Sequence, residues 1–89
     1  MTDDTLSALR SQIQDGRITA ETFNPKRSYK VLAMFGDDAG TMFMLIGEHD
    51  GAYGVFEARN QSQWSFHSGH SSLEGALDEI RGFNLKRLS

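Results

Sequence analysis

The chain has 89 residues, of which 38% are hydrophobic and 24% charged, with a formal net charge of −3. This length predicts a single small α+β domain over residues 1–89 with a modest core. The absence of cysteine excludes disulfides and thiol chemistry and, together with an acidic N-terminus unlike a signal peptide, favours a cytoplasmic location. The mild negative charge argues against dedicated nucleic-acid binding, and the longest apolar run, residues 42–46, is too short to cross a membrane.

The N-terminal segment is expected to be helical. Leu6, Leu9 and Ile13 recur at helical spacing, which predicts an amphipathic helix over residues 4–15. The next segment, residues 17–24, suits either a short helical turn or an edge strand, and both alternatives stay open.

A second helix is expected near the C-terminus. Ser71 and Glu74 form a Ser-x-x-Glu capping box that opens it, and Gly82 can end it. One stripe of this helix is apolar: Leu73, Ala76, Leu77 and Ile80. Lys86 and Arg87 are expected to lie in a short tail.

Alternating apolar segments separated by turn residues predict four strands between the helices. These strands are expected at residues 29–35, 41–48, 52–59 and 63–67. Asp50-Gly51 is the strongest hairpin signal, because a type I′ turn needs positive φ at both central residues. The predicted fold is therefore a four-stranded antiparallel meander sheet with an N-terminal and a C-terminal helix, in the order α-β-β-β-β-α.

Turn length sets the register of the strands, and the register decides which side chains share a face. Turns at residues 50–51 and 60–62 pair Phe56 with Leu45 and Phe66, and a turn at residues 36–40 pairs Phe35 with Thr41. One face then collects an aromatic core on which the C-terminal helix should pack: Val31, Ala33, Phe35, Phe43, Leu45, Phe56, Ala58, Trp64 and Phe66.

The opposite face carries more apolar residues than a solvated sheet face requires. They are Leu32, Met34, Met42, Met44, Ile46, Tyr53 and Val55. Either the N-terminal helix covers this face, or another protein or a second copy of the chain binds it. Because flexible methionine side chains suit adaptable binding surfaces, the predicted protein-binding residues are Leu32, Met34, Met42, Met44 and Tyr53, with Arg59 at the edge.

The histidines are the first candidates for catalysis or metal binding. His67 and His70 have a His-x-x-His spacing, with Ser68 between them and His49 elsewhere in the sequence. We expect His67 and His70 to flank a loop that leads into the C-terminal helix, where no third ligand is held in place. The prediction is therefore no catalytic residue, no metal site and no cofactor, with a small hydrolase or metal site around His67 and His70 as an alternative.

A basic strip is the candidate for nucleic-acid contact. It would combine Lys26, Arg27, Tyr29 and Lys30 with Lys86, Arg87 and Arg59. In an acidic chain, solvated surface charge is the favoured interpretation of these residues.

Residues 44–80 resemble the HicB-like antitoxin domain in the order of their motifs. The matching residues are Asp50-Gly51, Tyr53, Val55, Gly69 and the run Ser72-Leu73-Glu74-Gly75-Ala76-Leu77. The resemblance implies an antitoxin-like regulator associated with nucleic acid. It covers under half of the chain, and the proline that marks a strand end in that family is missing, so we interpret it as shared supersecondary structure.

The expected function is that of a non-enzymatic protein-binding module. The absence of a catalytic motif, the surplus apolar face and the small size favour an inhibitor, immunity or accessory protein that blocks a larger partner. A nucleic-acid-associated regulator is the second expectation, and a small hydrolase is the third.

Overall fold

The computed structural model describes residues 2–88, with side chains from residue 4 onward. The chain begins with α1 (Thr2–Ser11) and continues through β1 (Arg17–Ala20), β2 (Arg27–Gly36), β3 (Met42–His49), β4 (Ala52–Arg59) and β5 (Ser65–His70). It ends with α2 (Leu73–Arg81) and the short β6 (Lys86–Arg87). The α+β class, the antiparallel sheet and the two helices are as predicted, but the number of strands is not.

The sheet has two strands beyond the four that the sequence predicted. β1 to β5 are neighbours in chain order, and β6 pairs with β2. β1 pairs with one end of β2, opposite residues 27–30, whereas β6 pairs with the other end, opposite Phe35 and Gly36. β1 is the edge strand that was one of the two alternatives for residues 17–24, and it occupies residues 17–20. β6 lies in the expected tail and has only two residues, too few for an alternating pattern.

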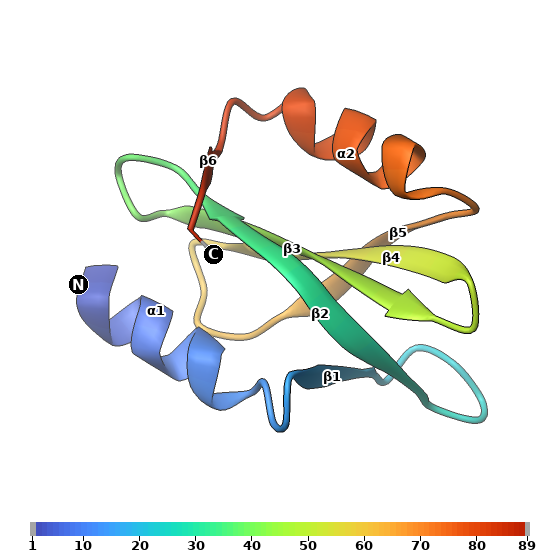
Figure 1. Ribbon diagram of the computed structural model, residues 1–89. Helices are drawn as coiled ribbons and strands as arrows, with labels where there is room; N and C mark the ends of the chain where they lie inside the picture. The colour runs from blue at the N-terminus through green and yellow to red at the C-terminus, as the bar shows by residue number, and fades with distance from the viewer. Residues whose placement is uncertain (1, 89) are drawn as a thin grey trace.

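The two helices lie on opposite faces of the sheet (Figure 1). α1 lies on the aromatic face, where Leu9 is fully buried. The cluster on this face comprises Leu9, Ile18, Ala20, Tyr29, Met34, Phe43, Leu45, Phe56, Ala58 and Trp64. The prediction that the C-terminal helix packs on this face is therefore wrong.

α2 covers the second face of the sheet, which was expected to be open or covered by α1. Its Ala76 and Ile80 are buried there with Ala33, Phe35, Met44, Ile46 and Val55. Five of the apolar residues that are surplus in the sequence, Met42, Met44, Ile46, Tyr53 and Val55, therefore belong to a second core beneath α2. Ser72 caps this helix by accepting a hydrogen bond from the Gly75 N–H, so the cap is one residue later than the predicted Ser71.

The β3–β4 hairpin has the predicted register. Leu45 pairs with Phe56, and the turn residues Asp50 and Gly51 both have positive φ, 50° and 81°. Phe56 pairs with Phe66 as predicted, and beyond that pair a β-bulge at His67 shifts the rest of β5. This shift extends β5 to His70, past the predicted end at residue 67.

The β2–β3 register differs from the prediction. Phe35 pairs with Met44 and not with Thr41, a shift of three positions (44 − 41 = 3). Because the shift is odd, it exchanges the two faces of β2 in this region. Met34 therefore faces α1, and Phe35 faces α2. A bulge between Val31 and Ala33 reverses the exchange toward the start of β2.

No helix within the described residues is long and apolar enough to span a membrane.

Candidate functional site

The structure separates the predicted protein-binding residues. Met44 is completely buried beneath α2, and Met34 is 4% exposed in the core beneath α1. The two methionines lie on opposite faces because of the β2–β3 register. The predicted face is therefore not one open surface, and α2 occupies most of it.

The other four predicted residues are more accessible. Met42 and Tyr53 are half-buried against the core beneath α2. Leu32 is 37% exposed at the β2 bulge. Arg59 is exposed, and its guanidinium lies 5.8 Å from the centroid of the Phe83 ring. The structure brings Met42, Met44 and Tyr53 to one face but does not join them to Met34.

A groove of about 480 Å³ lies at one end of the sheet, beside β5. Its lining residues are mostly aromatic or small: Phe23, Arg27, Tyr29, Ala52, Tyr53, Phe66, Gly69, His70 and Ser71. The segment between β1 and β2 forms one wall, because the Phe23 ring meets the Phe66 ring edge to face at 5.2 Å. Tyr29 lies 6.1 Å from Phe66 and contributes a third ring. We define these lining residues as the β5 groove.

Two paired glycines give Tyr29 its place in this groove. Gly47 of β3 and Gly54 of β4 face each other in the ladder. A Cβ on Gly47 would lie 2.6 Å from the Tyr29 Cβ, and one on Gly54 would lie 2.9 Å from both the Tyr29 and the Phe66 rings. Only glycine allows the aromatic side chains to approach the strands this closely.

The outer edge of β5 is continuous with the groove. β5 is the last strand in the sheet order, and no backbone hydrogen bond within residues 2–88 joins its outer edge to another strand or loop. Gly69 of β5 also lines the groove and places no side chain between its own backbone and the Phe66 ring. An unpaired strand edge can accept the backbone of another extended chain.

Among the described lining residues, the exposed Arg27 is the one lysine or arginine of the groove. The Arg27 guanidinium lies 4.2 Å from the centroid of the Phe23 ring. Among the described side chains, no carboxylate pairs with Arg27, whereas the neighbouring Lys26 is paired with Glu21 at 3.0 Å. The groove therefore combines an aromatic lining with an arginine that has no anionic partner in the described chain.

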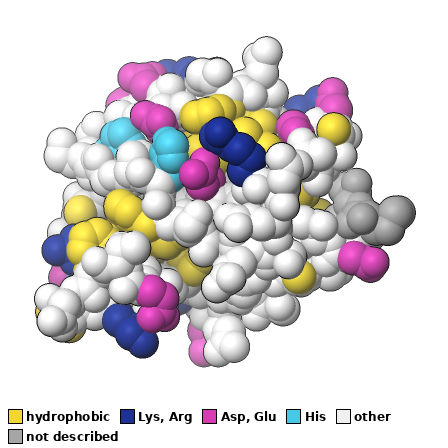
Figure 2. Space-filling model, turned by 180° about the vertical axis from the view of Figure 1, so that it is seen from behind, with side chains coloured by type: hydrophobic (Ala, Val, Ile, Leu, Met, Phe, Trp, Pro, Cys, Tyr) yellow, Lys and Arg dark blue, Asp and Glu magenta, His cyan; other side chains and the backbone are white. Residues whose placement is uncertain are grey.

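His67 and His70 both lie in β5 and do not flank a loop as predicted. His67, the bulge residue, lies between two carboxylates, with Nε2 2.8 Å from Glu79 Oε2 and Nδ1 3.5 Å from Glu57 Oε1. This contact connects β4, β5 and α2. Figure 2, seen from behind, shows histidine side chains gathered next to acidic and basic side chains, with apolar side chains below them.

The contacts of His70 and His49 test the alternative prediction of a small hydrolase or a metal site. Ser68 Oγ and His70 Nε2 lie 2.9 Å apart, which is hydrogen-bond distance for a nucleophile and a base. Within the described residues no carboxylate orients the other ring nitrogen of His70, and no group of three or more histidine, aspartate or glutamate residues could hold a metal ion. His49 lies apart from this pair, with Nδ1 3.0 Å from the Ser28 carbonyl oxygen.

The predicted basic strip is not assembled into one surface. Lys26, Arg27, Tyr29 and Lys30 lie at the start of β2, and Tyr29 is only 2% exposed. Lys86 and Arg87 pair with the far end of the same strand. The two groups are therefore separated by most of the length of β2.

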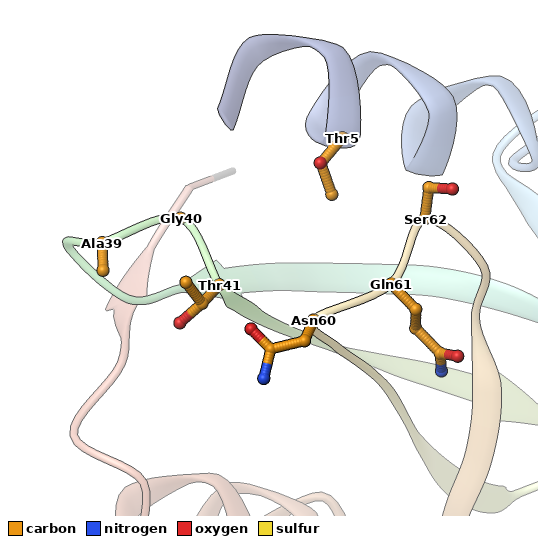
Figure 3. A pocket seen from close by; sticks show the side chains of 7 residues that line it. All are labelled: Thr5, Ala39, Gly40, Thr41, Asn60, Gln61 and Ser62. Carbon is orange, nitrogen blue, oxygen red and sulfur yellow. The ribbon is translucent and has the colours of Figure 1, made fainter. Parts of the chain in front are cut away.

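A second cavity, of about 470 Å³, lies between α1 and two loops. Figure 3 shows Thr5 extending from α1 toward the loops of residues 39–41 and 60–62. The Asn60 N–H donates to the Thr41 carbonyl oxygen at 2.7 Å and joins the two loops. The described lining residues are neutral and polar or small, so they supply no charge or aromatic surface for a ligand.

No protein-family model, no curated protein and no solved structure matches this chain. The resemblance of residues 44–80 to the HicB-like domain therefore gains no support.

The sequence predicted Tyr53 as a binding residue but missed the rest of the β5 groove. Phe23 lay in the ambiguous segment, Phe66 was assigned to the core, and Arg27 to a charged strip. One available signal was the pair Gly47 and Gly54 inside two predicted strands, because interior glycines often mark a close approach of another group.

Proposed function

We propose that this chain is a non-enzymatic protein-binding module that holds an extended segment of a partner protein along the outer edge of β5. The observation that supports the proposal is the continuity between this unpaired edge and the β5 groove. In such a mode, backbone hydrogen bonds to the strand supply affinity, and a neighbouring pocket for one side chain supplies specificity.

The shape of the edge favours a short segment of another protein. The bulge at His67 interrupts the ladder, and bulges at strand edges oppose long edge-to-edge pairing. Residues 68–70 form the regular part of the strand beside the groove. A second copy of the chain would have to align two interrupted edges, whereas a short partner segment needs only residues 68–70.

Such a module would act by keeping the bound segment of the partner protein from binding other molecules. This is the mode of action expected of a small inhibitor, immunity or accessory protein. The apolar sheet face expected from the sequence is replaced in this proposal by the β5 groove and edge, since α2 covers that face.

A displayed library of random peptides tests the proposal. Peptides selected on the wild-type protein would be titrated by fluorescence anisotropy, and backbone amides would be mapped by hydrogen exchange. We expect bound peptides to increase protection within β5. Protection confined to another part of the chain, or failure to select any peptide, would refute the proposal.

Gly69→Leu is the decisive variant. A Cβ at Gly69 would lie 3.7 Å from the Phe66 ring, an ordinary contact, so the fold can accept the side chain while it fills the groove. We expect it to weaken peptide binding by at least about tenfold. Thr19→Leu places the same side chain on an exposed position of β1 and should leave binding unchanged. Equal binding by the Gly69→Leu variant and the wild type would contradict the assigned site.

The two other functions have less support. The separation of the basic residues along β2 gives nucleic acid no continuous contact strip. The Ser68–His70 hydrogen bond favours a hydrolase, but a serine nucleophile also needs a group that orients its base and donors for the oxyanion. Ester hydrolysis that is lost in Ser68→Ala but not in Ser65→Ala would promote the hydrolase over the binding module.

A further inference from the structure

We infer that the β5 groove selects a partner segment in which an acidic side chain lies two positions from an apolar one. This inference rests on the proposed function and specifies the chemistry of the partner. It follows from the cationic side chain of Arg27, from the aromatic lining of the groove and from the spacing of side chains in an extended peptide.

Arg27 supplies the charge complementarity. It is the only lysine or arginine among the described lining residues, and none of those lining residues is acidic. Its guanidinium lies over the Phe23 ring, and a stacked guanidinium keeps its N–H donors in the plane, where a carboxylate can accept two of them. The adjacent Lys26 is paired with Glu21, so a carboxylate arriving at the groove meets Arg27 as the available cation.

The aromatic rings supply the apolar half of the site. Phe23 and Phe66 meet edge to face, and the Tyr29 ring lies beside Phe66. These rings line the same groove as Arg27. In an extended segment, residues two positions apart point to the same side and lie about 6.5–7 Å apart. One acidic and one apolar side chain at that spacing can therefore enter the groove together.

Three pools of synthetic peptides test this inference. Each pool contains β-branched segments with acetylated and amidated ends, a fixed leucine, and glutamate, glutamine or lysine fixed two positions away. On the wild-type protein, the glutamate pool should bind about tenfold more tightly than the glutamine pool, since a charge-assisted bidentate pair is worth that much. The lysine pool should bind most weakly of the three.

Two matched variants assign the preference to Arg27. Arg27→Gln should remove the difference between the glutamate and glutamine pools. Lys30→Gln removes the same charge from an exposed position of β2 that does not line the groove, and should preserve the difference. Thermal unfolding would verify that both variants remain folded. A glutamate preference that persists in Arg27→Gln would overturn the inference.

The remaining outcomes separate this inference from the proposed function. If the glutamate and glutamine pools bind the wild-type protein equally and both protect β5 amides, the acidic selection is wrong and the binding module stands. If no pool binds or protects β5, both proposals fail. A glutamine pool with a free C-terminal carboxylate that binds as tightly as the amidated glutamate pool would show that a chain terminus supplies the carboxylate, and would overturn the assignment to a side chain.

Discussion

The rings of Phe23 and Phe66 meet at a centroid distance of 5.2 Å and an interplanar angle of 81°. Phe23 lies between β1 and β2, whereas Phe66 lies in β5, at the other end of the strand order. The connection between β1 and β2 therefore reaches the last strand on the aromatic face of the sheet. There it forms one wall of the β5 groove.

The contact should be measurable as a coupling free energy. Phe23→Ala and Phe66→Ala should each lower the free energy of unfolding, and the double variant should lose less than the sum of the two. For an edge-to-face aromatic pair, the expected coupling is about 0.5–1.5 kcal/mol. Urea unfolding of the four proteins measures it. Strictly additive losses would mean that the two rings do not stabilise each other.

Gly54→Ala should destabilise the protein. Its Cβ would lie 2.9 Å from the rings of both Tyr29 and Phe66, so the aromatic side chains would have to move. We expect a loss of about 1–3 kcal/mol in the free energy of unfolding. Gly69→Ala is the matched control, because the nearest atom would be 3.7 Å away. Its stability should be close to that of the wild type.

Met44→Ala should reduce stability far more than it reduces binding per folded molecule. The side chain is fully buried beneath α2, and its truncation should cost about 2–5 kcal/mol. Met42→Ala should cost less, because Met42 is only half-buried. Melting temperatures and peptide affinities of the two variants test this. Weaker binding by a fully stable Met44→Ala variant would restore the binding role that the sequence predicted for this residue.

His67→Ala should lower stability by about 1 kcal/mol, because it removes a hydrogen-bonding group between Glu57 and Glu79 and leaves two carboxylates near each other. A His67 that flanks a loop, as the sequence predicted, would contribute little to stability. Chemical denaturation distinguishes these expectations.

The losses of stability caused by His67→Ala and Glu79→Ala should be non-additive in the double variant, because the two residues share one contact. Additive effects would argue against this contact.

Asp37 should make stability depend on pH in the acid range. Burial raises the pKa of its carboxyl group, but hydrogen bonds from the Thr41 hydroxyl and from the backbone of Met42, Thr41 and Gly40 outweigh this and hold the pKa below its ordinary value of 3.8. The resulting stabilisation is present above pH 3.8 and is lost as the pH falls through the lower pKa of the folded protein.

Asp37→Asn tests this dependence. The variant should be less stable than the wild type at neutral pH, and the difference should shrink as the solution is acidified. Asp38→Asn is the control, because within the described residues Asp38 forms a single surface ion pair, with the exposed Lys86. A stability difference for Asp37→Asn that stays constant down to the acid range would contradict the assigned hydrogen bonds.

The sequence by itself determined the elements whose signals are local. Asp50-Gly51 predicted the β3–β4 hairpin and its register, because a type I′ turn is specified by its two central residues. The turn after β4 likewise placed Phe56 opposite Phe66. These pairings predicted the burial of Phe56 and Trp64, which are 2% and 8% exposed.

The tertiary structure decided the register of β2 against β3, which the turn residues alone did not specify. Asp37 accepts hydrogen bonds from the backbone N–H groups of Thr41 and Met42, which closes a different loop from the predicted one and moves Phe35 opposite Met44. This register shift of three positions exchanges the two faces of β2, so Met34 and Met44 are buried under different helices.

The candidate site lay almost entirely beyond the reach of the sequence. Phe23 and Arg27 come from the connection between β1 and the start of β2, whereas Phe66 comes from β5, so no local pattern links the two parts. They meet because the paired Gly47 and Gly54 admit Tyr29 and because the β1–β2 connection reaches β5 on the aromatic face. Local propensities can specify a turn or a strand, but the curvature of a sheet and the meeting of its two ends follow from how all the strands pack together.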